Sequence, residues 1–233
     1  MTRYMTQMMP DAFDADQATA VLFSGGLDSA VLLAQAASRG PVQPLYISVG
    51  LAWEDEELAT ARQLIQAMPF GRRTRPLASL RFDMTDVYTA SHWAVRGDPP
   101  AYDTPDEEVY LEGRNIVLLA KAGVFMRRAN IARVLIGPLA GNPFPDATAE
   151  FFDAMSRALS TGLAESVAIE APFAKLHKAD VIRLGARLGV PFELTLSCMR
   201  PAAGVHCGRC SKCRERIEAF RDAGIADPAA YAD

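Results

Sequence analysis

The stretch Val21-Leu22-Phe23-Ser24-Gly25-Gly26-Leu27-Asp28-Ser29 decides the fold of this chain. Its three leading apolar residues suit a strand that is buried on both faces, as in a parallel sheet. The serine and the two glycines that follow let the backbone approach a ligand closely and turn its N–H groups toward it. The helix expected next adds the partial positive charge of its N-terminus at the same place. The stretch therefore predicts a strand, an anion-binding turn and a helix.

This turn differs from two common phosphate-binding loops. It lacks the Gly-Lys-Ser/Thr ending of a Walker loop and the third glycine of the dinucleotide fingerprint. It resembles instead the loop of the N-type ATP pyrophosphatases, which hold the β- and γ-phosphates and leave the α-phosphorus open to attack. That resemblance implies that ATP is bound by Phe23, Ser24, Gly25, Gly26, Leu27, Asp28 and Ser29. It also implies that Asp28 helps to organise Mg²⁺, whereas the alternative is a plain glycine-rich turn with a helix cap.

The composition is that of a globular protein. The 233 residues suit one α/β domain with a short appendage, and 50% hydrophobic with 22% charged residues is not the composition of a disordered chain. The net charge of -4 argues against broad adhesion to nucleic acid, which we do not expect as a direct substrate. No run approaches the roughly 18 apolar residues of a membrane span. We expect a cytoplasmic protein without a membrane anchor.

Hydrophobic periodicity predicts alternating strands and helices. Strands are expected near 21–23, 44–49, 133–137 and 167–169, and helices near 25–39, 58–68, 115–126, 147–162 and 178–188. Such units build a doubly wound, Rossmann-like parallel sheet that binds ligands beyond the carboxyl ends of its strands. We divide the chain into a polar, disorder-prone leader at 1–18, an α/β domain at 19–195 with a partly helical excursion at 71–112, and a zinc-binding tail with a terminal helix at 196–233.

Four cysteines gather near the C-terminus with the spacing Cys-x8-Cys-x2-Cys-x2-Cys. The thiolates of Cys198, Cys207, Cys210 and Cys213 can satisfy one tetrahedral Zn²⁺ ion, which leaves no position for a substrate. A structural zinc that orders the tail is therefore expected, because metal binding supplies folding free energy. Two disulfides or a redox Cys-x-x-Cys pair are the alternatives. His206 is expected to support the cluster from outside it or to be exposed.

Five features follow the order found in the 7-cyano-7-deazaguanine synthases, the nitrile-forming enzymes of the queuosine pathway. They are the loop at Ser24, the Glu-Gly-Arg-Asn run at 112–115, Pro145-Asp146, Lys178-Ala179-Asp180 and the four cysteines. The chain resembles this family from about Thr19 to Ile217. The resemblance implies an adenine nucleotide alpha-hydrolase type of fold and a homodimer. It further implies that ATP adenylates 7-carboxy-7-deazaguanine, that ammonia forms the amide, and that a second adenylation gives the nitrile.

The resemblance also assigns roles to site residues. Asp28, Arg114 and Lys178 are the expected catalytic residues. Asp28 would help to organise Mg²⁺, and the two cations would stabilise the charge that grows on departing pyrophosphate. Arg114, Asn115 and Asp146 are the expected substrate-binding residues, although Asp146 is also typical of a plain turn. The expected cofactors are one structural Zn²⁺ and Mg²⁺ with ATP. Basic residues around the cysteines, among them Lys212 and Arg216, are interpreted as solvated surface.

Two departures from the family leave the product open. Most members carry an aromatic-Gly-Gln-Arg-His run after the second strand, where this chain has Val49-Gly50-Leu51-Ala52-Trp53-Glu54, and Ala147 replaces the usual cysteine after Pro-Asp. Trp53 either stacks on an aromatic substrate or is a packing residue. A ligase that stops at the amide, or that joins a deazaguanine carboxylate to another amine such as one on a protein, shares the same site residues. More distant alternatives are a tRNA-thiolating pyrophosphatase and a non-catalytic zinc-ribbon binding module.

Overall fold

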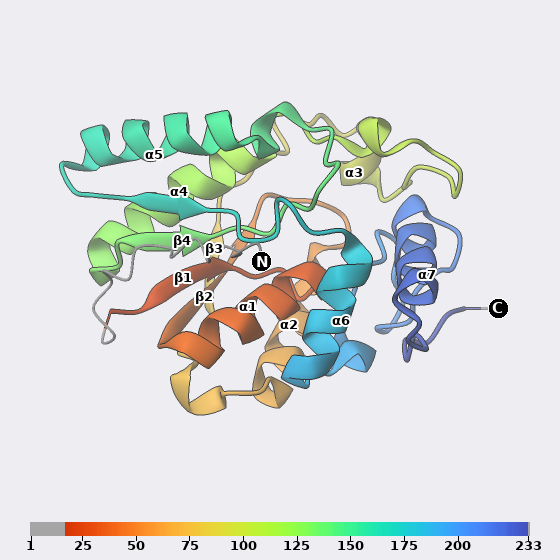
Figure 1. Cartoon of the computed structure of the whole chain (residues 1–233). Helices are drawn as coiled ribbons and strands as arrows, with labels where there is room; N and C mark the ends of the chain where they lie inside the picture. The colour runs from red at the N-terminus through yellow and green to blue at the C-terminus, as the bar shows by residue number, and fades with distance from the viewer. Residues whose placement is uncertain (1–16, 233) are drawn as a thin grey trace, which may run out of the picture.

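A five-stranded parallel sheet forms the centre of the molecule in the computed structural model, which describes residues 17–232 (Figure 1). The strands are β1 (Thr19–Leu22), β2 (Val42–Ser48), β3 (Ala78–Arg81), β4 (Arg133–Leu135) and β5 (Ala168–Glu170). Their order across the sheet is β3-β2-β1-β4-β5, and every neighbouring pair is parallel. The predicted doubly wound parallel fold is confirmed. Most of the predicted leader, residues 1–16, lies outside the described residues.

Helices cover both faces of this sheet (Figure 1). The helices are α1 (Leu27–Arg39), α2 (Glu54–Ala67), α3 (Trp93–Arg96), α4 (Arg114–Ala129), α5 (Ala149–Leu163), α6 (Lys178–Leu188) and α7 (Ser211–Ala223). One hydrophobic core joins α1, α2 and α6 to one face, and a second joins α4 and α5 to the other. Helix α7 packs on the outer side of α6 (Figure 1). None of the helices in the described part of the chain is long and apolar enough to cross a membrane.

The turn between β1 and α1 is held close to α2. Gly25 adopts a φ of 82°, in the region that favours glycine, and a Cβ there would lie 3.1 Å from the backbone of Ala61. Strand β1 is buried, so the turn begins from a rigid position in the middle of the sheet. The sequence therefore uses glycine where the chain must leave β1 and pass tightly beside α2.

Strand β3 was not predicted from the sequence. It lies inside the 71–112 segment and pairs only with β2, at the edge of the sheet. Its four residues alternate between half-buried and exposed, and only Ala78 and Leu80 are apolar. Such a short edge strand has too weak a hydrophobic pattern to be recognised without its neighbour.

Gly185 sets the spacing between α1 and α6. A Cβ at this position would lie 2.5 Å from the Phe192 ring and 2.6 Å from a methyl group of Val31. We therefore expect Gly185→Ala to lower the free energy of unfolding by about 1–3 kcal/mol, the usual cost of overpacking. Urea unfolding followed by circular dichroism measures this change.

Gly162→Ala is the matched control, because it lies near the end of α5 and a Cβ there meets nothing within 4 Å. It should leave stability unchanged or raise it by about 0.4–1 kcal/mol. Equal destabilisation by both substitutions would contradict the tight contact between α1 and α6.

Candidate active site

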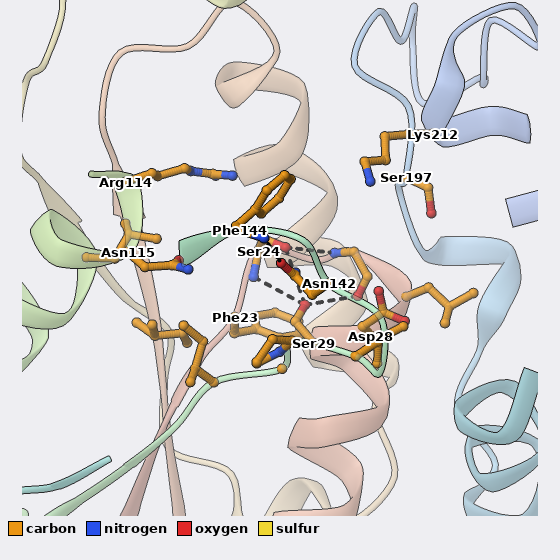
Figure 2. Close-up of a pocket in the computed structure, with 18 of the residues that line it drawn as sticks. Phe23, Ser24, Asp28, Ser29, Arg114, Asn115, Asn142, Phe144, Ser197 and Lys212 are labelled. Carbon is orange, nitrogen blue, oxygen red and sulfur yellow. Dashed lines mark hydrogen bonds between the residues drawn. The ribbon is translucent and has the colours of Figure 1, made fainter. Parts of the chain in front are cut away.

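A cavity of about 480 Å³ opens beyond the carboxyl ends of β1, β2 and β4 (Figure 2). Phe23 and Ser24 line it from the end of β1, Tyr46 from β2, and the segment 136–144 from the chain that follows β4. Strands β1 and β4 are neighbours in the sheet although four α-helices and two strands separate them in sequence. Ligands of open α/β sheets bind at such a switch in strand order.

The serine-glycine loop at the start of α1 is fixed by its own hydrogen bonds. Gly26 N donates to Ser24 Oγ at 3.2 Å, while Ser29 Oγ accepts from Ser24 N at 3.3 Å and donates to Gly26 O at 2.9 Å. The cavity wall includes Phe23, Ser24, Gly26, Leu27, Asp28 and Ser29. Gly25 lies outside this wall, and its carbonyl accepts a hydrogen bond from Leu196 N at 3.0 Å. A preformed loop at a helix N-terminus is suited to binding phosphate.

A row of alternating charges runs along one side of the cavity. Lys178 Nζ lies 3.2 Å from Asp28 Oδ2 and 2.5 Å from Glu215 Oε1, and Lys212 Nζ lies 2.8 Å from Glu215 Oε2. All four residues line the cavity, which brings the predicted pair of Asp28 and Lys178 together. Glu215 and Lys212 were missed, because their neighbouring cysteines suggested a purely structural segment.

These contacts shift the pKa values of the row. Burial raises the pKa of Asp28, against the attraction of Lys178. Burial opposes ionisation of Lys178 too, but the Asp28 and Glu215 carboxylates raise its pKa overall, so it stays charged. Burial acts against the charge of Glu215, but Lys178 and Lys212 together lower its pKa to about 2. Lys178 and Glu215 are therefore held in their charged forms, whereas burial acts against the charge of Asp28.

One oxygen in this row is available to a metal ion. Asp28 Oδ1 is shielded from solvent and has no hydrogen-bond partner among the described residues. A carboxylate oxygen beside a phosphate-binding loop is the type of ligand that Mg²⁺ takes together with substrate phosphates. The residues present therefore fit a magnesium ion that is bound together with a nucleotide.

The opposite side of the cavity is formed by the start of α4. Arg114 and Asn115 line the cavity there, and the Arg114 side chain extends toward it (Figure 2). Arg114 Nε is buried and has no hydrogen-bond partner within residues 17–232. An unpaired guanidinium nitrogen at a cavity wall suits a carboxylate or phosphate ligand, because burying it without an acceptor costs free energy.

Asp146 lies behind this wall rather than in it. It is buried, Asn115 N donates to its Oδ2 at 3.0 Å, and Asn115 Nδ2 donates to its backbone oxygen at 2.9 Å. The carboxylate thus binds an N–H at the first turn of α4, which the helix itself cannot satisfy. The structure assigns Asp146 to positioning Asn115 and the start of α4.

A tyrosine and a glutamate that sequence reasoning missed lie on the floor of the cavity. Tyr46 Oη donates to Glu57 Oε2 at 3.0 Å and to the Glu54 carbonyl at 3.1 Å. Burial raises the pKa of Glu57 to about 7, although Arg114 and the Tyr46 hydroxyl favour its charged form. A carboxyl group with this pKa can gain or lose a proton near neutral pH. The hydrophobic periodicity of a strand or a helix predicts which residues are buried. It does not predict that a side chain of β2 will contact a side chain of α2.

The altered run after β2 packs inside the protein. Trp53 is buried and stacks on Trp93, with ring centroids 5.9 Å apart. Glu54 accepts hydrogen bonds from Val49 N and Gly50 N, both at 2.9 Å. Neither Trp53 nor Glu54 lines the cavity. Trp53 is therefore a packing residue, and its alternative role as a stacking platform for substrate is not supported.

The four cysteines form a compact cluster. All four Sγ atoms lie within 4.8 Å of one another, and no disulfide joins them. Tetrahedral zinc with Zn–S bonds of about 2.3 Å requires sulfur atoms about 3.8 Å apart, and Cys207 and Cys213 are 3.9 Å apart. Backbone N–H groups of Arg200 and Cys207 donate to Cys198 Sγ at 3.3 and 3.2 Å, which supports a thiolate. The cluster fits the predicted zinc site, and the disulfide alternative is wrong.

Two basic side chains near the cluster are buried: Arg216, which was interpreted as solvated surface, and His206, for which exposure was one of two alternatives. His206 Nε2 accepts from Ser197 N at 3.1 Å, and burial lowers the pKa of His206 to about 4. Arg216 is fully buried and donates to Asp227, Thr195 Oγ1 and the Phe192 carbonyl. Both side chains fasten the cysteine segment to the rest of the chain.

Comparisons with known proteins give one family. The model of the queuosine biosynthesis protein QueC family matches residues 18–224. A 7-cyano-7-deazaguanine synthase of Anaeromyxobacter dehalogenans is 33% identical over 91% of this chain and 94% of its own. Proteins of the same name from Caldicellulosiruptor saccharolyticus and Methanothermobacter thermautotrophicus are 30% and 32% identical to this chain. The matches cover 94% and 97% of the length of these two relatives.

The raised pKa of Glu57 predicts a pH-dependent stability. The folded protein holds this proton up to about pH 7, whereas the unfolded chain loses it near the usual value of 4.5. The contribution of Glu57 to stability is therefore complete below pH 4.5 and is lost as the pH rises through 7. We expect Glu57→Gln to reduce the fall in unfolding free energy between about pH 5 and pH 8, measured by urea titration. Glu150→Gln, exposed on α5, should keep the wild-type slope.

The cysteine cluster predicts that zinc holds the C-terminal segment. We expect Cys210→Ser to lose the metal and to expose residues 196–232 to limited proteolysis, because the binding free energy of zinc stabilises that fold. Elemental analysis measures the zinc content. Ser211→Ala is the control, since this buried hydroxyl has no hydrogen-bond partner in the described part of the chain. Retention of one zinc ion by Cys210→Ser would contradict the assignment.

Proposed function

This chain belongs to the QueC family of queuosine biosynthesis proteins, and from that premise we propose that it converts 7-carboxy-7-deazaguanine and ammonia to 7-cyano-7-deazaguanine at the expense of ATP. The observation that carries the proposal is the cavity beside the Ser24–Ser29 loop, where Asp28 and Lys178 meet across from Arg114. A site for ATP and a carboxylic acid needs backbone N–H groups, a carboxylate for Mg²⁺ and cations. The cavity offers all three, with cations on both of its sides.

The reaction has two adenylation steps. In the first, a carboxylate oxygen of the deazaguanine attacks the α-phosphorus of ATP, and pyrophosphate leaves with the electrons of the broken P–O bond. Ammonia then attacks the acyl carbon, AMP leaves, and the amide remains. In the second, the amide oxygen attacks the α-phosphorus of another ATP. Loss of AMP and protons from the nitrogen gives the nitrile, so each nitrile requires two ATP and releases two AMP and two pyrophosphates.

The residues of the cavity have distinct roles in this proposal. The loop N–H groups and Lys178 bind the β- and γ-phosphates and stabilise the charge on departing pyrophosphate. Asp28 offers its unpaired oxygen to Mg²⁺, which neutralises phosphate charge when it is bound. Arg114 faces them and binds the carboxylate that attacks. No side chain is required as a covalent nucleophile, because positioning and electrostatics lower the barrier.

The replaced run at Val49-Gly50-Leu51-Ala52-Trp53-Glu54 supports a second candidate within the same chemistry. Its backbone N–H groups bind Glu54, and it presents none of the basic side chains of the family run. An enzyme of this kind could stop at the amide or join the acid to another amine. The third alternative, a zinc-ribbon module without catalysis, does not account for the ordered loop and its row of charges.

The compartment and the oligomeric state of the enzyme are also part of the proposal. We propose the cytoplasm, where thiols stay reduced, because four clustered free cysteines suit that compartment. We also propose a homodimer, on the resemblance to the family. Nucleic acid is not proposed as a direct substrate.

Removal of the Asp28 carboxylate tests the site. We expect Asp28→Asn to lower substrate-dependent AMP formation by about a hundredfold or more, because the magnesium ligand and the partner of Lys178 are lost together. Zinc content should not change, since the cysteines are separate from this contact. Asp153→Asn, exposed on α5, is the control that should keep full activity. Unchanged AMP formation by Asp28→Asn would refute the site.

The identity of the product separates the two candidates. The purified protein is incubated with 7-carboxy-7-deazaguanine, ATP and ammonium, and the products are identified by mass spectrometry. The proposal predicts the nitrile, with two AMP for each product molecule. Accumulation of the amide, or a conjugate with an added amine, would establish the second candidate instead.

A further inference from the structure

Lys212 lies between two zinc ligands in sequence and yet faces the proposed ATP cavity. Its neighbours on either side are Ser211 and the ligand Cys213, and Cys210 is the residue that precedes α7. Lys212 lines the cavity, and Figure 2 shows it across from Arg114 with its amine directed inward. The segment that the cysteines hold together therefore supplies a cation to the cavity.

The contacts of Lys212 leave it able to bind a ligand. An ammonium group has three N–H donors. Lys178 uses two of them, on Asp28 and Glu215. Within residues 17–232, Lys212 is paired with Glu215 at 2.8 Å, and its side chain is 30% exposed. Two donors of Lys212 therefore remain for an acceptor in the cavity.

Glu215 connects Lys212 to the phosphate-binding loop. One of its oxygens contacts Lys212, the other contacts Lys178, and Lys178 contacts Asp28 in the first turn of α1. Lys212 is thus held on the same side of the cavity as the loop, where the phosphate chain of ATP would lie. A lysine ammonium binds phosphate oxygens as a compact point charge.

The segments that carry the cysteines also form part of the cavity wall beside Lys212. Leu196 N donates to the Gly25 carbonyl in the loop, and Ser197, next to the ligand Cys198, also lines the cavity. The cluster therefore controls one wall of the cavity at two places, the 196–198 segment and the first turn of α7. A structural metal at this position would keep Lys212 oriented.

We propose that Lys212 is an additional phosphate-binding residue, which the zinc segment delivers to the β- and γ-phosphates of ATP and to the pyrophosphate that leaves. Glu215 is the positioning residue that holds it beside Lys178. This inference rests on the proposed function, because it takes ATP as the substrate of the cavity. It makes the zinc segment part of the nucleotide site.

Calorimetric titration of the full chain tests this role. The probes are Mg·ATP, inorganic pyrophosphate and AMP, each added without deazaguanine. We expect Lys212→Gln to weaken Mg·ATP and pyrophosphate binding by about tenfold or more and to leave AMP binding unchanged, because only the outer phosphates lose a charge-assisted hydrogen bond. Lys212→Arg should retain most of the affinity. Lys175→Gln, which removes the same charge at an exposed position outside the cavity, should bind like the wild type.

Acetylation of the wild-type protein gives a second readout, which needs no substitution and so cannot be affected by misfolding of a variant. Mg·ATP and pyrophosphate should each protect Lys212 from an acetylating reagent, whereas Lys175 should be modified equally with and without them. If the wild-type protein binds ATP and the bound ATP does not protect Lys212, this inference is overturned while the proposed function stands. Wild-type affinity of Lys212→Gln for both Mg·ATP and pyrophosphate would also overturn it. Wild-type protein that binds neither ATP nor pyrophosphate would overturn the proposed function as well.

Discussion

The ion pair between Asp28 and Lys178 joins the parts of the chain on which the site depends. Asp28 belongs to the first turn of α1, Lys178 begins α6, and Glu215 on α7 is the second partner of the lysine. The side chains of Asp28, Lys178 and Glu215 are 27%, 14% and 25% exposed, and partly desolvated charges are stabilised where they are paired. Their pairing joins the three helices at the edge of the cavity. The same contact serves the packing of the fold and, in the proposed function, the binding of ATP.

This dependence explains why the zinc segment lies where it does. Helix α7 is attached by Ala219 and Phe220, which join the core that contains α6, and by buried Arg216, which binds Asp227, Thr195 and Phe192. A metal bound at its start would add order to the cysteine segment that precedes it. Order at that place also places Glu215 and Lys212 in the wall of the cavity. In the proposed function, the cysteine cluster therefore supports one wall of the cavity as well as the tail.

The sequence predicted the features whose signal is local. Strand β1, the glycine loop and α1 follow one another within 21 residues, from Thr19 to Arg39, and the cysteines within 16, from Cys198 to Cys213, so a strand-turn-helix unit and a metal-type cysteine cluster could be predicted from the local pattern. Glu57 and Tyr46 could not be recognised, because their pairing depends on how α2 packs on β2. Lys212 was interpreted as solvated surface for the same reason: only the packing of α7 against α6 turns it toward the loop. Asp146 was predicted to bind substrate, whereas its carboxylate binds the start of α4 and does not line the cavity.

The central claim is that a carboxylate in this cavity attacks the α-phosphorus of ATP. Its most direct test uses 7-carboxy-7-deazaguanine whose carboxylate carries oxygen-18, followed through one turnover in the presence of ammonium. The account predicts that each of the two AMP molecules released per nitrile carries one labelled oxygen and that pyrophosphate carries none. Label in phosphate or pyrophosphate, or release of ADP in place of AMP, would contradict it.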